Sequence, residues 1–281
     1  MSHPALKPGN TALVTGGASG IGLAAAKRFA ALGMMVYIID QGEERMRAAM
    51  EAIEASVKSE SSGHWLYCIE ADVSDREQMF GLASTLQNID VLMNNAAISG
   101  GGSSALNSDN WQRVLDVNLW GVIHGTQAFA PAMVASGKPG LIINTGSKQG
   151  ITTPPGNPAY NVSKAGVKTF TEALQHELRN GANSAVTAHL LIPGFVWTGM
   201  TQGSQTEKPA GAWTSEETID FMLESVGRGD FYILCPDNDV PRALDEKRMA
   251  WAIGDVIENR PPLSRRHPDY AEAFQAFVEE K

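Results

Sequence analysis

Short apolar runs alternate with longer amphipathic stretches along most of the chain. Six runs read as strands, at residues 11–15, 34–40, 65–72, 90–96, 141–146 and 186–193. Because apolar residues follow one another within each run, we predict strands that are buried on both faces. Between them, apolar positions recur at helical spacing in residues 20–32, 43–58, 75–87, 108–136 and 158–180.

This alternation predicts the fold class. Strand–helix–strand repetition is typical of a parallel sheet with right-handed crossovers and helices on both faces. With a further short run at residues 231–235, we predict an α/β protein, a doubly wound parallel sheet of about seven strands in one domain over residues 1–281. In such sheets ligands bind beyond the carboxyl ends of the strands, which is where the chemistry is expected.

The pattern changes after residue 193. Residues 195–228 begin with a stretch rich in Gly, Thr and Ser, which predicts a substrate loop or lid, and a helix is expected from about Ser215. Residues 236–281 predict a charged helical extension, interrupted by Pro261 and Pro262 because two prolines cannot continue a helix.

Composition excludes several partners. The chain is 43% hydrophobic, which is enough for a sizeable core, and its net charge of −9 argues against nucleic acid or an anionic membrane surface. The first ten residues lack the apolar segment of a signal peptide, and no apolar run is long enough to span a bilayer. The two cysteines and six histidines show no metal-ligand spacing, so we expect a cytoplasmic protein without a metal.

A glycine-rich segment, TGGASGIG, joins the first predicted strand to the first predicted helix. Gly16 suits a tight turn, Gly20 lets the backbone approach a pyrophosphate, and Gly22 lets helix and strand pack closely. Thr15 and Ser19 add hydroxyl donors, and the helix N-terminus favours negative charge. The alternative is a connection without a ligand, but the strand–turn–helix context favours a dinucleotide loop and a Rossmann-type sheet.

Asp40 ends the second predicted strand. A carboxylate there accepts hydrogen bonds from both hydroxyls of an adenosine ribose and repels a 2′-phosphate. Neither Ser19 nor Gln41 is basic, and the nearby Arg45 is expected on the outer face of the next helix. We therefore predict NAD rather than NADP, while a helix-capping role for Asp40 stays open beside the cofactor role.

Several polar residues follow strand ends and predict one catalytic cleft. Tyr160 and Lys164 share a helix face, Ser147 follows the strand 141–146, Asn95 follows the strand 90–96, and Asn118 lies inside a predicted helix. Each also has a structural interpretation. Tyr160 could be a surface tyrosine that packs on the Lys164 stem, and Ser147 could be a turn hydroxyl. Asn95 could brace the backbone, and Asn118 could be a buried amide with its hydrogen bonds satisfied.

In this order, and together with ADV at 71–73, PG at 193–194 and Thr198, these motifs resemble the short-chain dehydrogenase/reductase family over roughly residues 9–200. The resemblance implies NAD-dependent interconversion of a secondary alcohol and a ketone. It makes Tyr160 the acid/base, with a pKa lowered by Lys164, and it makes Ser147 the residue that holds the substrate oxygen. Asn118 would position a water that links Lys164 to solvent.

The same resemblance places Asp72 and Val73 at the adenine, Asn95 and Ala96 along the cleft, and Thr198 at the carboxamide. Motifs and resemblance together predict these cofactor-binding residues: Gly16, Ser19, Gly20, Ile21, Gly22, Asp40, Asp72, Val73, Asn95, Ala96, Tyr160, Lys164, Pro193, Gly194 and Thr198.

The C-terminal part departs from the family, in which a final strand and a Gly-rich turn often pack a tetramer. We expect a homodimer or homotetramer, with its arrangement left open by this departure.

The partner is expected to be a small-molecule substrate. It should be uncharged, because no basic cluster faces the predicted cleft, and it should carry a bulky aryl or alicyclic group. Lys148 is the exception: it either contacts the substrate or faces solvent. Trp197 and Trp213 either contact the substrate or pack the lid. The alternative function is a non-catalytic NAD-binding sensor or scaffold on the same fold.

Overall fold

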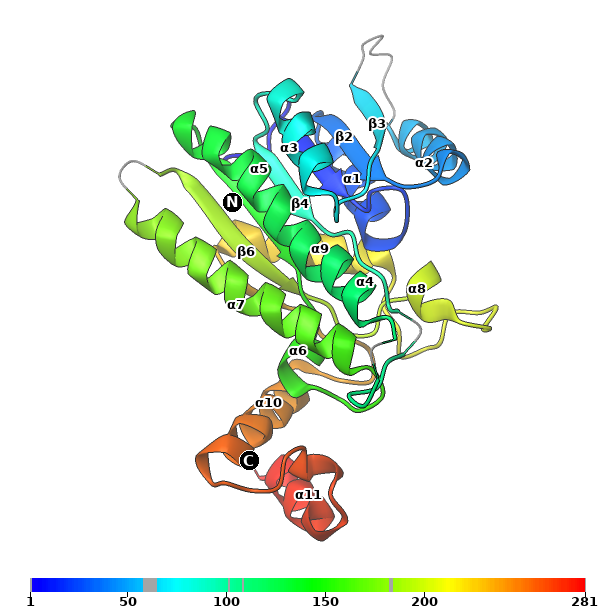
Figure 1. The fold of residues 1–281 in the computed structure, drawn as a ribbon, viewed down its shortest axis with the longest axis vertical. Helices are drawn as coiled ribbons and strands as arrows, with labels where there is room; N and C mark the ends of the chain where they lie inside the picture. The colour runs from blue at the N-terminus through cyan, green and yellow to red at the C-terminus, as the bar shows by residue number, and fades with distance from the viewer. Residues whose placement is uncertain (1, 58–64, 101, 108, 182–183, 281) are drawn as a thin grey trace.

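The computed structural model describes residues 2–57, 65–100, 102–107, 109–181 and 184–280. These residues contain one sheet of seven parallel strands in the order β3-β2-β1-β4-β5-β6-β7 (Figure 1), which confirms the predicted fold class. The strands are β1 (Thr11–Thr15), β2 (Met35–Asp40), β3 (Leu66–Glu70), β4 (Val91–Asn94), β5 (Gly140–Thr145), β6 (Val186–Ile192) and β7 (Tyr232–Leu234).

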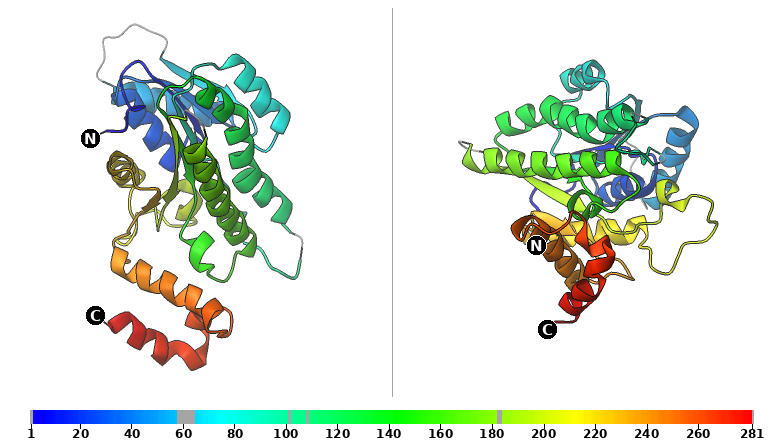
Figure 2. Two further views of the ribbon diagram at one scale, coloured as in Figure 1. Left: turned by 90° about the vertical axis from the view of Figure 1, so that its left-hand side faces the viewer. Right: turned by 60° about the horizontal axis from the view of Figure 1, so that its bottom comes forward.

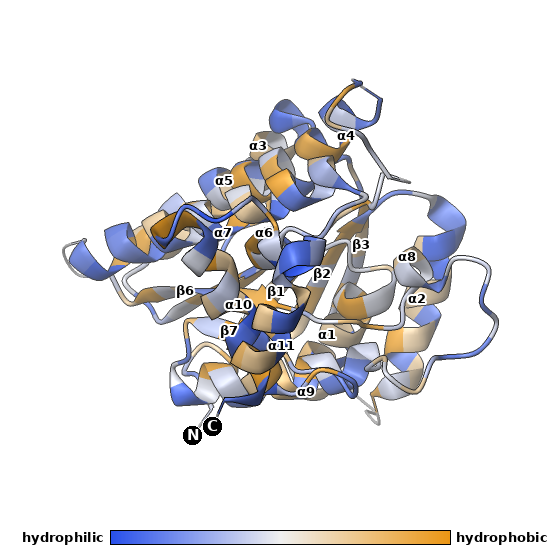
Figure 3. Ribbon diagram, turned by 90° about the horizontal axis from the view of Figure 1, so that it is seen from below, coloured by the Kyte–Doolittle hydropathy of each residue, from blue (hydrophilic) through white to orange (hydrophobic). Residues whose placement is uncertain are grey.

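Helices cover both faces of this sheet (Figure 2). One layer consists of α1 (Gly20–Ala31), α2 (Glu43–Ser56) and α9 (Ser215–Arg228), and the other of α3 (Arg76–Thr85), α5 (Gly121–Ala135) and α7 (Pro158–Asn180). Figure 3 shows apolar residues concentrated in the central strands and polar residues on the outer sides of the helices. The alternating pattern of the sequence therefore reflects a three-layer core.

The central and the outer strands differ in burial. Every residue of β1, β4 and β5 is buried, as the continuous apolar runs predict. The expectation of burial on both faces is wrong for β3, whose residues are only half-buried or exposed. The reason is its position at the edge of the sheet, where Tyr67 stacks on Tyr37 of β2 with ring centroids 4.7 Å apart.

The long helix predicted at residues 108–136 is continuous from Trp111 to Ala135, with one π-helical turn inside it. It consists of α4 (Trp111–Leu115), a π-helical turn (Asp116–Trp120) and α5, while residue 108 lies outside the described residues. Single π-helical turns inside α-helices often occur at functional sites, and this one contains Asn118.

The short helices α6 (Gln149–Thr152) and α8 (Gly199–Gln202) follow β5 and β6 at the carboxyl edge of the sheet. Beyond this edge lies the C-terminal extension, which comprises α10 (Arg242–Ile257), two 3-10 turns (Ser264–Arg266 and Pro268–Tyr270) and α11 (Ala271–Glu279) (Figures 1 and 2). The buried ring of Trp251 holds it together, 5.3 Å from the rings of Phe274 and Phe277 and hydrogen-bonded to Ser264 at 2.7 Å.

Candidate active site

One cleft runs along the carboxyl ends of the strands, from β2 to β6. All the predicted site residues except Gly22 and Asn118 line it: Gly16, Ser19, Gly20, Ile21, Asp40, Asp72, Val73, Asn95, Ala96, Ser147, Tyr160, Lys164, Pro193, Gly194 and Thr198. The structure thus brings together residues from seven segments of the chain at the edge where ligands of such sheets bind.

The glycine-rich turn at the start of α1 has a backbone that side chains would obstruct. Gly16 and Gly20 have φ angles of +64° and +51°, in the left-handed region that favours glycine. A Cβ on Gly22 would lie 2.1 Å from the carbonyl oxygen of Gly16, so Gly22 allows the helix to pack on the turn rather than lining the cleft. An open backbone at the N-terminus of α1 fits the pyrophosphate of a dinucleotide.

Asp40 braces this turn. Its Oδ2 accepts a hydrogen bond from the Ala18 N–H at 2.9 Å, and its Oδ1 accepts one from the Gln41 N–H at 2.8 Å. The capping alternative is wrong, because Gly42 occupies the N-cap position of α2. Asp40 therefore lies between the glycine-rich turn and the end of β2, in the wall of the cleft.

Two arginines, Arg45 and Arg113, line this end of the cleft. No sequence pattern predicts Arg113 here, and Arg45 is expected on the outer face of its helix. Nη2 of Arg45 lies 3.1 Å from Oδ1 of Asp40, and Arg45 lines the cleft, so its expected position on the outer face is wrong. Arg113 also lines the cleft and interacts electrostatically with Asp72. A long side chain can reach back past the end of its helix, and the five-residue spacing from Asp40 was the only signal for Arg45.

The segment after β4 is held from two sides. The hydroxyl of Thr15 accepts hydrogen bonds from the N–H groups of Asn95 and Ala96, at 3.0 and 3.2 Å. Asn95 donates to the Gly16 carbonyl at 3.3 Å and accepts from the Thr145 hydroxyl at 3.2 Å. Asn95 is thus a backbone brace as well as a wall of the cleft, while Thr15 supports that wall without lining it.

Tyr160 and Lys164 project from the first turns of α7, which begins at Asn157 and Pro158. Nζ of Lys164 donates a 2.8 Å hydrogen bond to the carbonyl of Thr145, the last residue of β5, and lies 5.8 Å from the centroid of the Tyr160 ring. The side chain of Ser147 lies close enough to Tyr160 to lower the pKa of its phenol. A proton donor or acceptor, a cation and a hydroxyl therefore meet at one point of the cleft.

The pKa values of this pair reflect their surroundings. Burial lowers the pKa of Lys164 to about 8. The Tyr160 ring is partly exposed to the cleft, but protein surrounds most of the phenol, and this desolvation raises its pKa against a smaller opposite effect of Ser147. The lowering of the Tyr160 pKa that the family resemblance implies is therefore not seen.

Asn118 is a fully buried amide with its groups paired. Its Nδ2 donates to the Ile98 carbonyl at 2.9 Å and to the Ser163 hydroxyl at 3.3 Å, and its Oδ1 accepts from the Ile98 N–H at 2.7 Å. Both N–H groups are used, so only Oδ1 has capacity left for the water that the resemblance implies. Asn118 holds Ile98, which does line the cleft.

Part of the cleft lining is apolar and includes Ile98, Val196 and Met200. Neither Trp197 nor Trp213 lines it; the indole N–H of Trp213 donates to Asn238 at 3.1 Å, and its ring packs edge-on against Phe221. The lid-packing interpretation therefore holds for Trp213.

Lys148 follows neither interpretation given to it. Its ammonium lies 3.2 Å from a carboxylate oxygen of Asp237 and 2.5 Å from one of Asp245, and its side chain is largely buried. It therefore does not line the cleft, and only a small part of its side chain is exposed to solvent.

The described ranges contain no group of three His, Cys, Asp or Glu side chains that would hold a metal ion. No helix within those ranges is both long and apolar enough to cross a membrane.

The family profile described as short chain dehydrogenase matches residues 10–209. A 1-deoxy-11-beta-hydroxypentalenate dehydrogenase from Streptomyces avermitilis is 31% identical over 252 residues, which cover 86% of this chain and 90% of the relative. The structure of a short-chain dehydrogenase/reductase from Burkholderia phymatum in complex with NAD aligns with a TM-score of 0.79 at 28% identity, over 92% of this chain and 97% of that one. A variant of actinorhodin polyketide ketoreductase with NADPH aligns with a TM-score of 0.68 at 28% identity, over 79% of this chain and 92% of that one.

Proposed function

The chain belongs to the short-chain dehydrogenase/reductase family, and we propose that it interconverts a secondary alcohol and a ketone with NAD(H). At the level of the family and its relatives, this is an oxidoreductase that acts on hydroxyl and keto groups. The observation that carries the proposal is the meeting of Ser147, Tyr160 and Lys164 in the cleft that also contains the glycine-rich turn.

In this mechanism, Tyr160 exchanges a proton with the substrate oxygen. A bound nicotinamide supplies the hydride acceptor or donor. During alcohol oxidation the phenolic oxygen of Tyr160 takes the hydroxyl proton, and Ser147 donates a hydrogen bond that orients the substrate oxygen. The Lys164 ammonium, aligned by the Thr145 carbonyl, stabilises the phenolate form of Tyr160.

Preference for NAD over NADP rests on Asp40. Its carboxylate lies in the cleft wall and offsets the charge of Arg45, which would otherwise attract a 2′-phosphate. The similar structures are described with NAD in one case and NADPH in another, so the pair formed by Asp40 and Arg45 is the feature that argues for NAD.

An uncharged, bulky substrate suits the apolar part of the cleft lining. Ile98, Val196 and Met200 are apolar, and Lys164 is engaged with Thr145. Lys148, which directly follows Ser147 in sequence, is paired with two carboxylates, so it does not offer a charge to an anionic substrate. Two similar proteins, a hydroxypentalenate dehydrogenase and a polyketide ketoreductase, support a bulky substrate.

We also expect a homodimer or homotetramer. Ile253, Val256 and Ile257 of α10 are 57%, 76% and 75% exposed, and their spacing puts them on one side of the helix. Contact with a second copy would remove this apolar surface from water, and size-exclusion chromatography with light scattering measures the resulting mass.

The proposed function is tested with a panel of bulky secondary alcohols and ketones, assayed with NAD(H) and NADP(H) side by side by nicotinamide absorbance. Tyr160→Phe should abolish turnover and leave dinucleotide binding intact. Tyr37→Phe, which removes a phenol hydroxyl outside the cleft, is the matched control and should keep full activity. Turnover by Tyr160→Phe at the wild-type rate contradicts the assignment, and dinucleotide binding without turnover of any substrate supports the sensor alternative.

A further inference from the structure

The residue that follows Ser147 lies in a cluster of buried charges outside the substrate cleft. The Lys148 ammonium faces the carboxylates of Asp237, at 3.2 Å, and Asp245, at 2.5 Å. The three side chains are 13%, 7% and 4% exposed. Arg248 also interacts electrostatically with Asp245. Buried charges are expensive to desolvate, so the presence of this cluster calls for a reason.

Lys148 holds the turn after β6 from two directions. Its main-chain N–H donates to the carbonyl of Pro193 at 3.3 Å. Its side-chain partner Asp237 accepts from the N–H of Phe195, also at 3.3 Å. Between these contacts lies Gly194, where a Cβ would come within 2.5 Å of the Asp237 carboxylate and 2.8 Å of the Lys148 ammonium.

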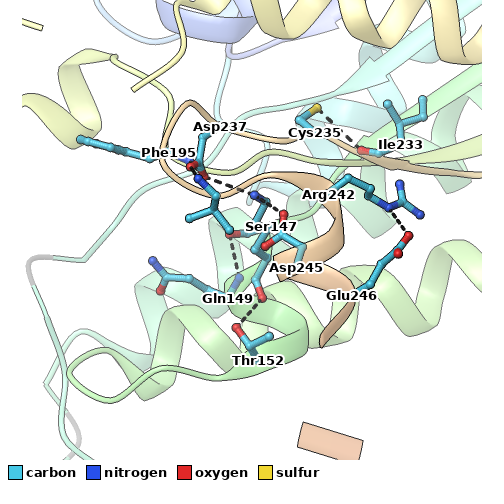
Figure 4. Close-up of polar contacts among 12 residues, drawn as sticks. Ser147, Gln149, Thr152, Phe195, Ile233, Cys235, Asp237, Arg242, Asp245 and Glu246 are labelled. Atoms are coloured by element: carbon cyan, nitrogen blue, oxygen red, sulfur yellow. Dashed lines mark hydrogen bonds and ion pairs between the residues drawn. The ribbon is translucent and has the colours of Figure 1, made fainter. Parts of the chain in front are cut away.

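The same turn and the catalytic serine both line the cleft. Pro193 and Gly194 contribute to its wall, as does Ser147, whose hydroxyl accepts from the N–H of Gln149. Figure 4 shows Ser147 and Gln149 beside Asp237 and Asp245, which come from the segment after β7 and from α10. α10 also packs on α6, the short helix that follows Ser147.

We propose that Lys148 is a positioning residue that ties the catalytic-serine segment and the 193–195 turn to the C-terminal extension through Asp237 and Asp245. This proposal rests on the proposed dehydrogenase function. The extension then belongs to the active site, because it holds the two segments that face the reacting end of the cleft. The adenosine end, around Asp40 and Asp72, is not in contact with the cluster.

The decisive comparison is Asp245→Asn against Glu246→Gln. Asp245→Asn leaves Lys148 in a one-to-one pair with Asp237, so the chain should still fold. Glu246 is the next residue of α10 and forms an exposed pair with Arg242, outside the cluster (Figure 4), so its amide variant is a matched control. Asp237→Asn is a second variant that keeps the pair between Lys148 and Asp245.

Asp245→Asn should lower kcat by about tenfold, because a small displacement of positioning groups costs one to two orders of magnitude in rate. The KM for the dinucleotide should stay within about twofold of wild type, because most of its binding surface is at the other end of the cleft. Amide hydrogen exchange should increase in residues 147–152 and 193–198, and remain unchanged in β1 and β4. Glu246→Gln should match wild type in every measurement.

Two results overturn the proposal. One is a wild-type kcat in both Asp245→Asn and Asp237→Asn. The other is faster exchange that is confined to residues 236–280, which would mean that the cluster only anchors the extension. Hydrogen exchange needs no substrate, so an enzyme that turns over nothing in the panel overturns the proposed function while exchange still decides the positioning role.

Discussion

The Lys164 ammonium donates a 2.8 Å hydrogen bond to the carbonyl oxygen of Thr145, which joins the start of α7 to the last residue of β5. This contact sets the direction of a side chain that is almost completely buried, and it leaves the charge beside the Tyr160 ring. Burial at this point lowers the pKa of Lys164 to about 8, so its charge is lost within an accessible pH range.

We therefore predict that kcat/KM for ketone reduction falls above about pH 8. Burial raises the pKa of Tyr160, which keeps the phenol protonated and ready to donate at neutral pH. Lys164 is charged below its lowered pKa and stabilises the phenolate that forms; above it, this support disappears, and the rate should drop about tenfold per pH unit. Lys168→Arg, at a half-buried pair with Glu172 outside the cleft, should keep the same profile. A profile that stays flat up to about pH 10 contradicts this role of Lys164.

Gly22→Ala should destabilise the protein and weaken dinucleotide binding. The new Cβ would lie 2.1 Å from the Gly16 carbonyl oxygen, so the turn must shift at a cost of about 1–3 kcal/mol. Gly81→Ala on α3 is the control, because nothing lies within 4 Å of its Cβ position, and it should stabilise the helix by about 0.5–1 kcal/mol. Urea unfolding and dinucleotide titration measure both, and equal effects at the two positions would argue against the close packing at Gly22.

Asp40→Asn should shift cofactor preference toward NADP by about tenfold or more in relative kcat/KM, a change of about 1.4 kcal/mol. The variant removes the charge that repels a 2′-phosphate and releases Arg45, whose guanidinium lies 3.1 Å from it. Arg45→Ala should cancel this gain when combined with Asp40→Asn and should change NAD kinetics little on its own. A wild-type enzyme that already prefers NADP contradicts the role assigned to Asp40.

Asn118→Leu should destabilise the protein by about 2–4 kcal/mol, because it leaves the partly buried N–H and carbonyl of Ile98 unpaired and removes a fully buried amide. Activity should fall as well, since Ile98 lines the cleft. Asn180→Leu, at the exposed end of α7, should cost much less. Comparable losses in the two variants, measured by urea unfolding, would exclude the bracing role of Asn118.

Local sequence patterns predict most of the fold and the centre of the candidate site. The continuous apolar runs predict β1, β4 and β5, and strand ends followed by Gly16, Ser147 or Asn95 predict the cleft, because parallel strands all present their carboxyl ends at one edge. The four-residue spacing of Tyr160 and Lys164 predicts a shared helix face, which the structure shows. These features depend on neighbours in sequence and on the regular geometry of helices and strands.

Only the tertiary structure decided which distant groups each side chain contacts. Lys148 follows Ser147 in sequence, but its partner Asp237 is 89 residues away, in the part of the chain that departs from the family pattern. Neighbours in the fold likewise decide three other features. These are the partial exposure of β3, the position of Arg45 in the cleft lining and the pairing of Asn118 with Ile98. Desolvation and ion pairing arise from surroundings assembled by folding, so the pKa values of Tyr160 and Lys164 follow from the packed site rather than from their spacing.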